Sequence, residues 1–375
     1  SALLLLKAQP TPEGNLLEYL GELCSKFIDE SIEPDKLTEL RQLIEQETVT
    51  QALSIIEDGT RKHSCRFDYD YNAGFNMLMP NLSNMRNIIR IMSVKSCILA
   101  EAGRRDAAWQ LALTQLRFAD AMRNEPILIS FLVRLVSIRT SCVTIQRICQ
   151  IAPPNEEQYH IIEKLLLDYE DREQLILAMD GERLLGGEWA FNMLRNGSAQ
   201  DMSVLTGEES ELVEMSMSLY STFKPLFLAD KAAYMRIMAE HSRSVQQPYS
   251  PNEADNMDRK VEQMHSRLHI VTSIILPALH RVKERYWQIV AQMRITRAGL
   301  ALLQDSKTQG PFPDTLEKLK DINDPFSGKP LLYKPDPNGF ILYSAGSDEK
   351  DNGGSPRQNN KEEEWDIVWS YISER

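Results

Sequence analysis

Apolar residues recur at every third or fourth position through most of residues 1–279, which is the spacing of helices that bury one face. The pattern is clearest in residues 15–32, where Leu16, Leu20 and Leu23 share one face. It predicts further helices over residues 34–59, 84–102, 106–123, 127–151, 156–179 and 207–241. The segment 127–151 is apolar on nearly all sides, so we expect that helix at the centre of the core.

Two stretches interrupt this pattern. Residues 61–82 are aromatic and polar, and we expect a long ordered loop there. The rings of residues 67–75 either plug one end of the helical core or line a groove for a peptide. The pairs Gly186-Gly187 and Asn196-Gly197 predict turns around a short apolar segment.

The pattern changes after residue 280. A long helix is predicted up to Asp305, with apolar residues at near-heptad spacing and charged residues opposite. Short Leu-Leu-Tyr and Phe-Ile-Leu-Tyr runs follow, and they predict a β-hairpin that turns at residues 335–339. A last strand is expected at residues 367–372.

The expected fold is therefore mainly α, in two parts. Residues 1–279 form an all-α multi-helix body, and residues 280–375 form a module with a long helix and a small antiparallel β-sheet (α+β).

The balance of charge excludes two classes of partner. The chain has 42 Lys and Arg against 54 Asp and Glu, which gives a net charge of −12. Nucleic-acid binding needs a basic surface, and so does purely electrostatic binding to an anionic membrane. We therefore expect no nucleic-acid partner.

The cysteines indicate neither a disulfide framework nor a metal knuckle, because the 5 thiols are odd in number and contain no Cys-x-x-Cys pair. We expect all of them to be buried apolar thiols. Cys142 and Cys149 are two helical turns apart and share one helix face.

The chain begins Ser-Ala-Leu-Leu-Leu-Leu-Lys, and we expect that a natural N-terminal segment is missing. Ala2 to Leu6 is either the tail of a signal sequence or membrane anchor, or the start of a core helix. No run reaches the ~20 apolar residues of a bilayer span. The longest candidate, residues 270–279, is too short. A membrane is therefore expected as a partner only through a missing N-terminal anchor.

An acidic loop precedes the last expected strand. It contains Asp348, Glu349, Asp351, residues 362–364 and Asp366, which repel one another unless a cation lies among them. Calcium takes about six to eight oxygen ligands from carboxylates and carbonyls, which such a loop offers. Asp351 is a candidate ligand because Asp-Asn-Gly-Gly lets the backbone curl around an ion. The alternative is a solvated, disordered acidic loop.

The order of motifs after residue 282 resembles a known family. The motifs are Gly310 with Pro313, then Asp324-Pro325-Phe326 with Gly328, Pro330 and Tyr333, then Leu342-Tyr343-Ser344 with Gly346 and Asp348, and finally Asp366-Ile367. This order resembles the C-terminal domain of the major pseudopilin of type II secretion and its type IV pilin-like relatives. In that family the helix packs on a small antiparallel sheet, and the loop before the last strand binds calcium.

The resemblance implies which residues would hold the ion. Calcium ligands would come from Asp348 and Asp366, with Glu364 in place of an earlier Asp of the family pattern, and from backbone carbonyls near Leu342 and Ser347. Three features depart from the pattern: Glu349 stands where the family often has Gly, residues 355–363 look like an insertion, and Trp369 is one residue closer to Asp366. The helical body is similar only to uncharacterised bacterial envelope proteins, and this similarity implies no activity.

An enzymatic alternative rests on two Glu-x-x-His motifs, which end in His160 and His265. On helices this spacing places a carboxylate and an imidazole on one face, as in di-iron bundles, which need one further Glu from each of two other helices. No unambiguous pair supplies them. A zinc-dependent enzyme that uses the same histidines is the other form of this alternative.

Taken together, these features favour a non-catalytic function over an enzymatic one. We expect an extracytoplasmic scaffold or interaction protein of the periplasm, tethered to the inner membrane and linked to secretion or envelope assembly. We expect a protein partner and a C-terminal loop ordered by calcium.

Overall fold

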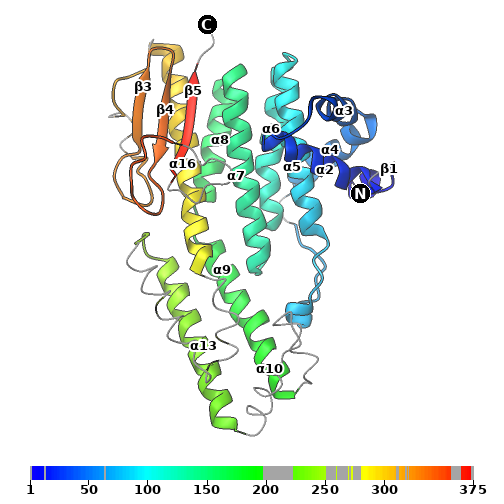
Figure 1. The fold of residues 1–375 in the computed structure, drawn as a ribbon, viewed down its shortest axis with the longest axis vertical. Coiled ribbons are helices and arrows are strands. Elements are labelled where there is room, and N and C mark those ends of the chain that lie inside the picture. Colours follow the sequence, from blue (N-terminus) through cyan, green and yellow to red (C-terminus); the bar gives the residue numbers. More distant parts are fainter. Residues whose placement is uncertain are drawn as a thin grey trace.

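The computed structural model describes residues 2–11, 14–62, 65–196, 223–250, 280–309, 312–316, 321–355 and 365–372, together with the single positions 259, 269, 272 and 319. Within them, helices dominate and a 3-stranded antiparallel sheet lies near the C-terminus (Figure 1). The expected fold class, mainly α with a small sheet, is confirmed.

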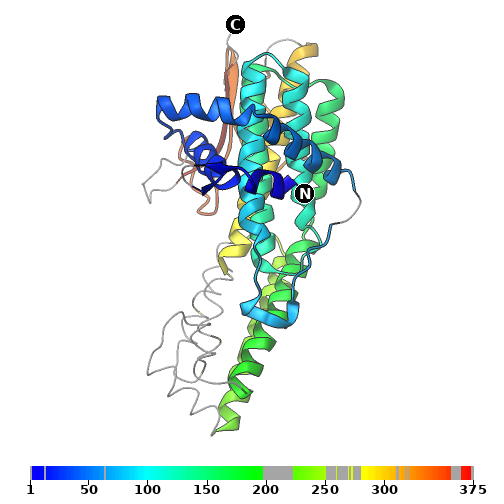
Figure 2. The same ribbon diagram turned by 90° about the vertical axis from the view of Figure 1, so that its right-hand side faces the viewer.

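The N-terminal helices lie across the long helices of the molecule (Figure 2). They are α1 (Ala2–Lys7), α2 (Leu16–Ile28), α3 (Pro34–Ile44) and α4 (Glu47–Thr60), with a short pair of strands, β1 (Pro10–Thr11) and β2 (Gly14–Asn15). Ala2 and Leu6 are buried in the core beneath these helices, as expected for the start of a core helix.

One predicted helix in this region is wrong. The helix expected over residues 34–59 is two helices, because the chain turns at Glu45 and Gln46. The turn lets Ile44 at the end of α3 and Val49 at the start of α4 both enter the same core.

The central helices are α5 (Asn81–Glu101), α6 (Arg105–Phe118), α7 (Leu128–Ile151), α8 (Glu156–Tyr169) and α16 (His280–Gln309). As expected, α7 is at the centre, since it contacts α5, α6, α16 and strand β5. By length and mean hydropathy (1.7) α7 is long and apolar enough to cross a membrane. However, 67% of its most apolar window is buried against the rest of the protein, which is typical of a core helix.

A narrower part of the molecule extends from one end of the central helices (Figure 1). It contains α9 (Glu173–Gly181), a π-helical segment (Glu182–Gly187), α10 (Glu188–Asn196) and α13 (Lys224–Val245). The helix predicted over residues 156–179 is interrupted between α8 and α9. Residues 197–222 and most of residues 251–279 lie outside the described residues. The predicted Asn196-Gly197 turn is at this boundary, because Asn196 is described and Gly197 is not.

The turn expected at Gly186-Gly187 is wrong, because the chain continues there as a π-helical segment. Gly187 lies against the ring of Tyr234 from α13, and a Cβ on Gly187 would be 2.2 Å from Cε1 of that ring. This glycine therefore permits close packing rather than a change of chain direction.

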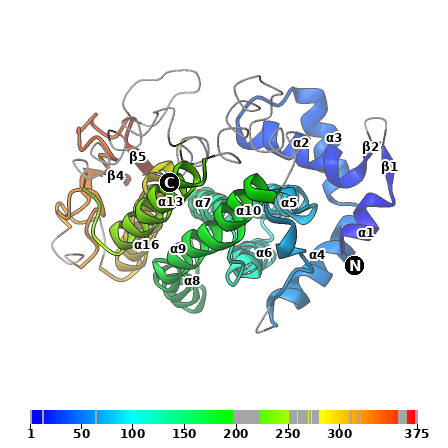
Figure 3. The same ribbon diagram turned by 90° about the horizontal axis from the view of Figure 1, so that it is seen from below.

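The C-terminal sheet has the order β3-β4-β5, with β3 (Leu332–Asp336), β4 (Gly339–Ser344) and β5 (Ile367–Ile372). The expected hairpin and last strand are confirmed: Asp336 pairs with Gly339 around a turn formed by Pro337 and Asn338. Seen from below, this sheet and α1–α4 lie at opposite ends of the row of central helices (Figure 3).

Helix α16 joins the sheet to the helical body. Residues from both sides of the boundary expected at 279/280, such as Trp109 and Ile145 on one side and Ile295 and Trp369 on the other, belong to one hydrophobic cluster. The two expected units therefore pack together through a continuous core. The side chain of Gln150 also completes the outer edge of β5, because Nε2 donates to the Ser370 carbonyl (2.7 Å) and Oε1 accepts from the Ile372 N–H (3.3 Å).

Charged residues on α16 form a second contact with the helical body. Arg294 and Arg297 bind Glu170, which directly follows α8, at 2.8 and 2.9 Å, and Arg297 also binds Glu163 of α8 at 2.7 Å. The charged face expected to be opposite the apolar one is therefore partly buried against α8 instead of facing water.

Gly299 provides a test of how the sheet docks. A Cβ at Gly299 would lie 2.0 Å from Cζ3 of Trp369, whereas a Cβ at Gly59, near the end of α4, would meet nothing within 4 Å. By helix propensity, Gly→Ala stabilises a helix by up to about 1 kcal/mol. We expect this gain for Gly59→Ala, but a loss of about 1–3 kcal/mol for Gly299→Ala because the indole must move. Urea denaturation measures both; equal stabilisation by the two substitutions would contradict this packing.

Candidate functional site

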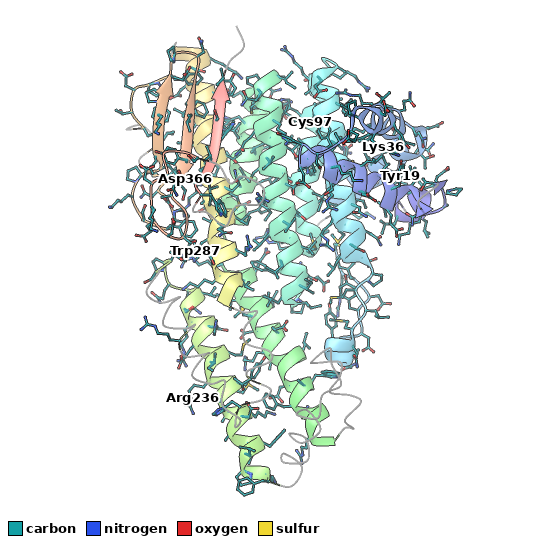
Figure 4. All side chains as sticks on the ribbon, viewed as in Figure 1. Tyr19, Lys36, Cys97, Arg236, Trp287 and Asp366 are labelled. Atoms are coloured by element: carbon teal, nitrogen blue, oxygen red, sulfur yellow. The ribbon has the colours of Figure 1, made fainter. Side chains whose placement is uncertain are left out.

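The loop between β4 and β5 is organised by Asp366, which is only 1% exposed and lies beside α16 at the lower end of the sheet (Figure 4). Its Oδ2 accepts hydrogen bonds from the N–H groups of Gly354 (2.7 Å) and Ser355 (3.2 Å), and its Oδ1 accepts one from Asn352 (3.4 Å). Gly353 and Gly354 have φ of 74° and 76°, which directs neighbouring N–H groups to one side. The backbone therefore forms an anion-binding concavity around this carboxylate.

The other described acids of the loop are nearer the surface. Asp351 Oδ1 accepts from the hydroxyl of Tyr343 (3.0 Å) and the N–H of Gly353 (2.8 Å). Burial, followed by the hydrogen bond to Asp351, raises the pKa of Tyr343 to about 12. Asp348 is exposed, and its Oδ1 accepts from the N–H of Lys350 (3.1 Å).

The residues predicted to supply backbone ligands, Leu342 and Ser347, lie in and shortly after strand β4. Leu342 is fully buried and pairs with Trp369 in the sheet. The carbonyl of Ser347 accepts from the Tyr249 hydroxyl at 3.3 Å, and the Ser347 hydroxyl donates to Glu284 at 2.8 Å. Glu364 lies outside the described residues.

These positions bear on the predicted calcium site in two ways. The oxygen donors are of the type that calcium prefers. However, the carboxylates of Asp348, Asp351 and Asp366 each already accept a backbone N–H. The part of the chain that the structure describes also holds no group of three or more His, Cys, Asp or Glu side chains able to share a metal ion. The charge of Asp366 is stabilised by backbone amides, so calcium binding stays a prediction.

The Asp-Pro-Phe motif of the expected module builds a turn that supports this loop. Asp324 is 3% exposed, and its Oδ1 accepts from the N–H of Phe326 (2.9 Å), while its carbonyl accepts from the N–H of Gly328 (2.9 Å). Burial raises the pKa of Asp324. The ring of Phe326 packs edge-on against Tyr249, whose hydroxyl contacts the loop at Ser347.

A groove of about 400 Å³ opens beside the loop, between α7, α16 and residues 365–368. Its walls include Leu132 and Val136 of α7 and Ile289 of α16, together with glutamine side chains of both helices. Val136 is 50% exposed. The groove exists only where the sheet module docks on the helical body, so neither part forms it alone.

The two histidines of the enzymatic alternative are not brought together by described residues. His160 is on the surface of α8, and its side chain is 67% exposed. Its Nε2 lies 3.9 Å from Oε1 of Glu156, whereas the motif pairs the histidine with Glu157. His265 lies outside the described residues.

The aromatic loop is held against the end of the core. The rings of Phe67 and Tyr69 stack at 5.4 Å, and Tyr69 meets Tyr71 edge-on at 6.3 Å. Buried Glu125 accepts from the Tyr71 hydroxyl (2.7 Å) and from the Phe67 N–H (3.3 Å). This arrangement agrees with the plug interpretation of residues 67–75.

One buried charged residue, Arg134, was not predicted from the sequence. Arg134 of α7 is 2% exposed, its Nη2 lies 3.6 Å from Oδ1 of Asp120, and its guanidinium is 4.9 Å from the centre of the Tyr169 ring. The Tyr169 hydroxyl donates to Oδ2 of Asp120 at 3.1 Å. Burial lowers the pKa of Arg134 and raises that of Tyr169. An arginine within an otherwise apolar helix was the signal, because such a charge needs a buried partner.

The expectation for the thiols is confirmed at four positions and wrong at one. Cys24, Cys97, Cys142 and Cys149 are buried, whereas Cys65 is exposed because it lies in the loop after α4. Burial raises the pKa of Cys97 to about 11 and of Cys142 to about 12, so these thiols stay neutral.

No family model, curated protein or solved structure matches this chain.

The role of Asp366 can be tested by Asp366→Asn. Whichever way the amide is turned, its NH₂ group faces at least one N–H donor, so we expect a loss of about 1–3 kcal/mol in the free energy of unfolding. Amides 352–355 should also exchange hydrogen faster. In the control Asp348→Asn, the exposed side chain should change stability by less than about 0.5 kcal/mol. Unchanged exchange at residues 352–355 in Asp366→Asn would contradict the assignment.

Proposed function

We propose that this protein is a non-catalytic scaffold or interaction protein, located outside the cytoplasm and tethered to the inner membrane, which binds a protein partner through the groove between α7, α16 and residues 365–368. The observation that carries the proposal is the groove itself. It combines exposed apolar surface at Val136 with the polar side chains of Gln146 and Gln292, a mixture found at protein interfaces.

The rigidity of the groove supports a scaffold role. Its two helical walls are held in place by Gln146, whose Nε2 donates to the hydroxyl of Thr296 on α16 at 2.9 Å in a buried position. The ion pairs of Arg294 and Arg297 with Glu170 hold α16 against α8 on the other side. A preformed surface loses little conformational entropy when a partner binds.

The location and the calcium ion are parts of the proposal supported by the pseudopilin resemblance. The described loop offers oxygen donors at Asp348, Asp351 and Asp366. The link to secretion or envelope assembly has the same support. A metal-dependent enzyme that uses His160 and His265 remains the alternative from the sequence, and no contact of the described residues favours it over the scaffold.

The partner hypothesis is tested by Val136→Arg, which places a charge on the groove wall. We expect the full-length wild-type chain to capture a defined partner from an envelope extract of its native host, and Val136→Arg to lose it, because a buried unpaired charge at an interface is costly. The control is Leu167→Arg on α8, where the side chain is 54% exposed and outside the groove. Equal capture by the wild type and Val136→Arg would contradict the proposal.

Calcium binding is tested separately by thermal unfolding and calorimetric titration. If the loop binds calcium, an ion concentration of 100 Kd should stabilise the fold by about 2.7 kcal/mol. Magnesium should have little effect because it prefers a smaller and more regular site. Asp348→Asn should weaken the binding, whereas Asp336→Asn, an exposed acid of the hairpin turn, should not. Absence of a calcium-dependent shift in the wild type would remove the calcium site and leave the groove untouched.

A further inference from the structure

A second cleft, of about 430 Å³, is lined by residues between 56 and 124, which are distant in sequence from the acidic loop. It is formed where the end of α4 meets the end of α6 and the 3₁₀ segment Ala119–Met122. Four of its lining residues are basic: Arg61, Lys62, Arg117 and Arg123. Only one is acidic, Asp120. This concentration of positive charge is notable because the whole chain has a net charge of −12.

Asp120, the one acid that lines the cleft, does not neutralise these cations, because its carboxylate already contacts two buried side chains. Oδ1 of Asp120 lies 3.6 Å from the buried guanidinium of Arg134, and Oδ2 accepts from the hydroxyl of Tyr169. Asp120 and the buried Arg134 therefore form an ion pair that is close to neutral as a unit, which leaves the four cations that line the cleft without compensation from Asp120.

Two of the basic side chains have counter-charges nearby. Arg61 binds Glu57 of its own helix at 2.6 Å, and Arg123 lies 4.0 Å from Asp171. The side chains of Lys62 and Arg117, by contrast, make neither an ion pair nor a hydrogen bond with any residue that the structure describes. Cations that converge without partners repel one another, and an anion between them removes that repulsion.

We propose that this cleft binds a small molecule that carries a phosphate group. A phosphate monoester has a charge close to −2 at neutral pH and three strong acceptor oxygens, which suits several converging cations better than a single carboxylate does. The guanidinium of Arg117 can bind two of these oxygens at once. The volume of about 430 Å³ is in the range of small-molecule sites, and Ile56 and Phe118 add apolar wall for the rest of the ligand.

Phosphate groups of this kind occur on soluble phosphate esters and on phospholipid headgroups. Both present the same chemistry to the cleft, so the experiment must separate them. The probes are pyrophosphate, glycerol 3-phosphate, and vesicles of phosphatidylcholine with or without phosphatidic acid.

The test compares the wild-type full-length chain with Arg117→Gln and Lys62→Gln. The matched control is Arg105→Gln, an exposed arginine at the other end of the same helix α6 and outside the cleft. We expect saturable binding of pyrophosphate by calorimetry, weakened about tenfold by each cleft substitution because each removes a charge-assisted contact. Arg105→Gln should bind as the wild type does. Since the side chains of Lys62 and Arg117 have no described partner, neither variant should melt at a lower temperature than the wild type.

Each outcome decides the proposal. Saturable binding of pyrophosphate or glycerol 3-phosphate that depends on Arg117 supports it and identifies a soluble ester. Binding only to vesicles with phosphatidic acid, again lost in Arg117→Gln, supports it and identifies a lipid headgroup. Binding that follows ionic strength alone, or that falls equally in Arg105→Gln and Arg117→Gln, overturns it. A melting temperature raised equally by sodium chloride and by pyrophosphate at the same ionic strength also overturns it.

Discussion

The structure depends on the burial of α16 on more than one side. Between Ile289 and Leu303 nearly every residue of this helix is shielded from water, so no single neighbour can cover it. The sheet covers one side through Trp369, and α7 and α8 cover others. Gly299 allows the indole to approach the helix backbone, and Arg294 and Arg297 find their counter-charges at the end of α8. The groove proposed to bind a partner is a consequence of this packing, because its walls are α7 and α16.

Features that depend on neighbours in sequence could be predicted well. The central position of α7 followed from its apolar composition, and the hairpin followed from short apolar runs that are separated by turn residues. Errors arose where distant contacts decide the local structure. The glycine pair at residues 186–187 lies in a π-helical segment, where Gly187 packs on Tyr234 of the distant helix α13. The break at Glu45 and Gln46 leaves no strong local signal, since both α3 and α4 keep apolar residues at helical spacing.

The candidate sites show the same division. The acids of the loop could be named from the sequence. The role of Asp366 as an acceptor for three backbone N–H groups could not, because it depends on the left-handed conformation of Gly353 and Gly354. The basic cleft could not be found in this way, because its cations come from two separated segments, around Arg61 and around Arg117. A net charge is a sum over the whole chain, so it could be used to predict that nucleic acid is not a partner, but it does not indicate where positive charge gathers.

The central claim is that the sheet module and the helical body are one cooperative unit joined by α16. Native-state hydrogen exchange measures this most directly, because each amide reports the free energy of the opening that exposes it. The account predicts that amides of β4, such as that of Leu342, exchange with the same free energy as those at the centre of α7, such as that of Cys142. Exchange of the β4 amides at a free energy several kcal/mol lower, with α7 still protected, would show that the module opens on its own and would contradict the account.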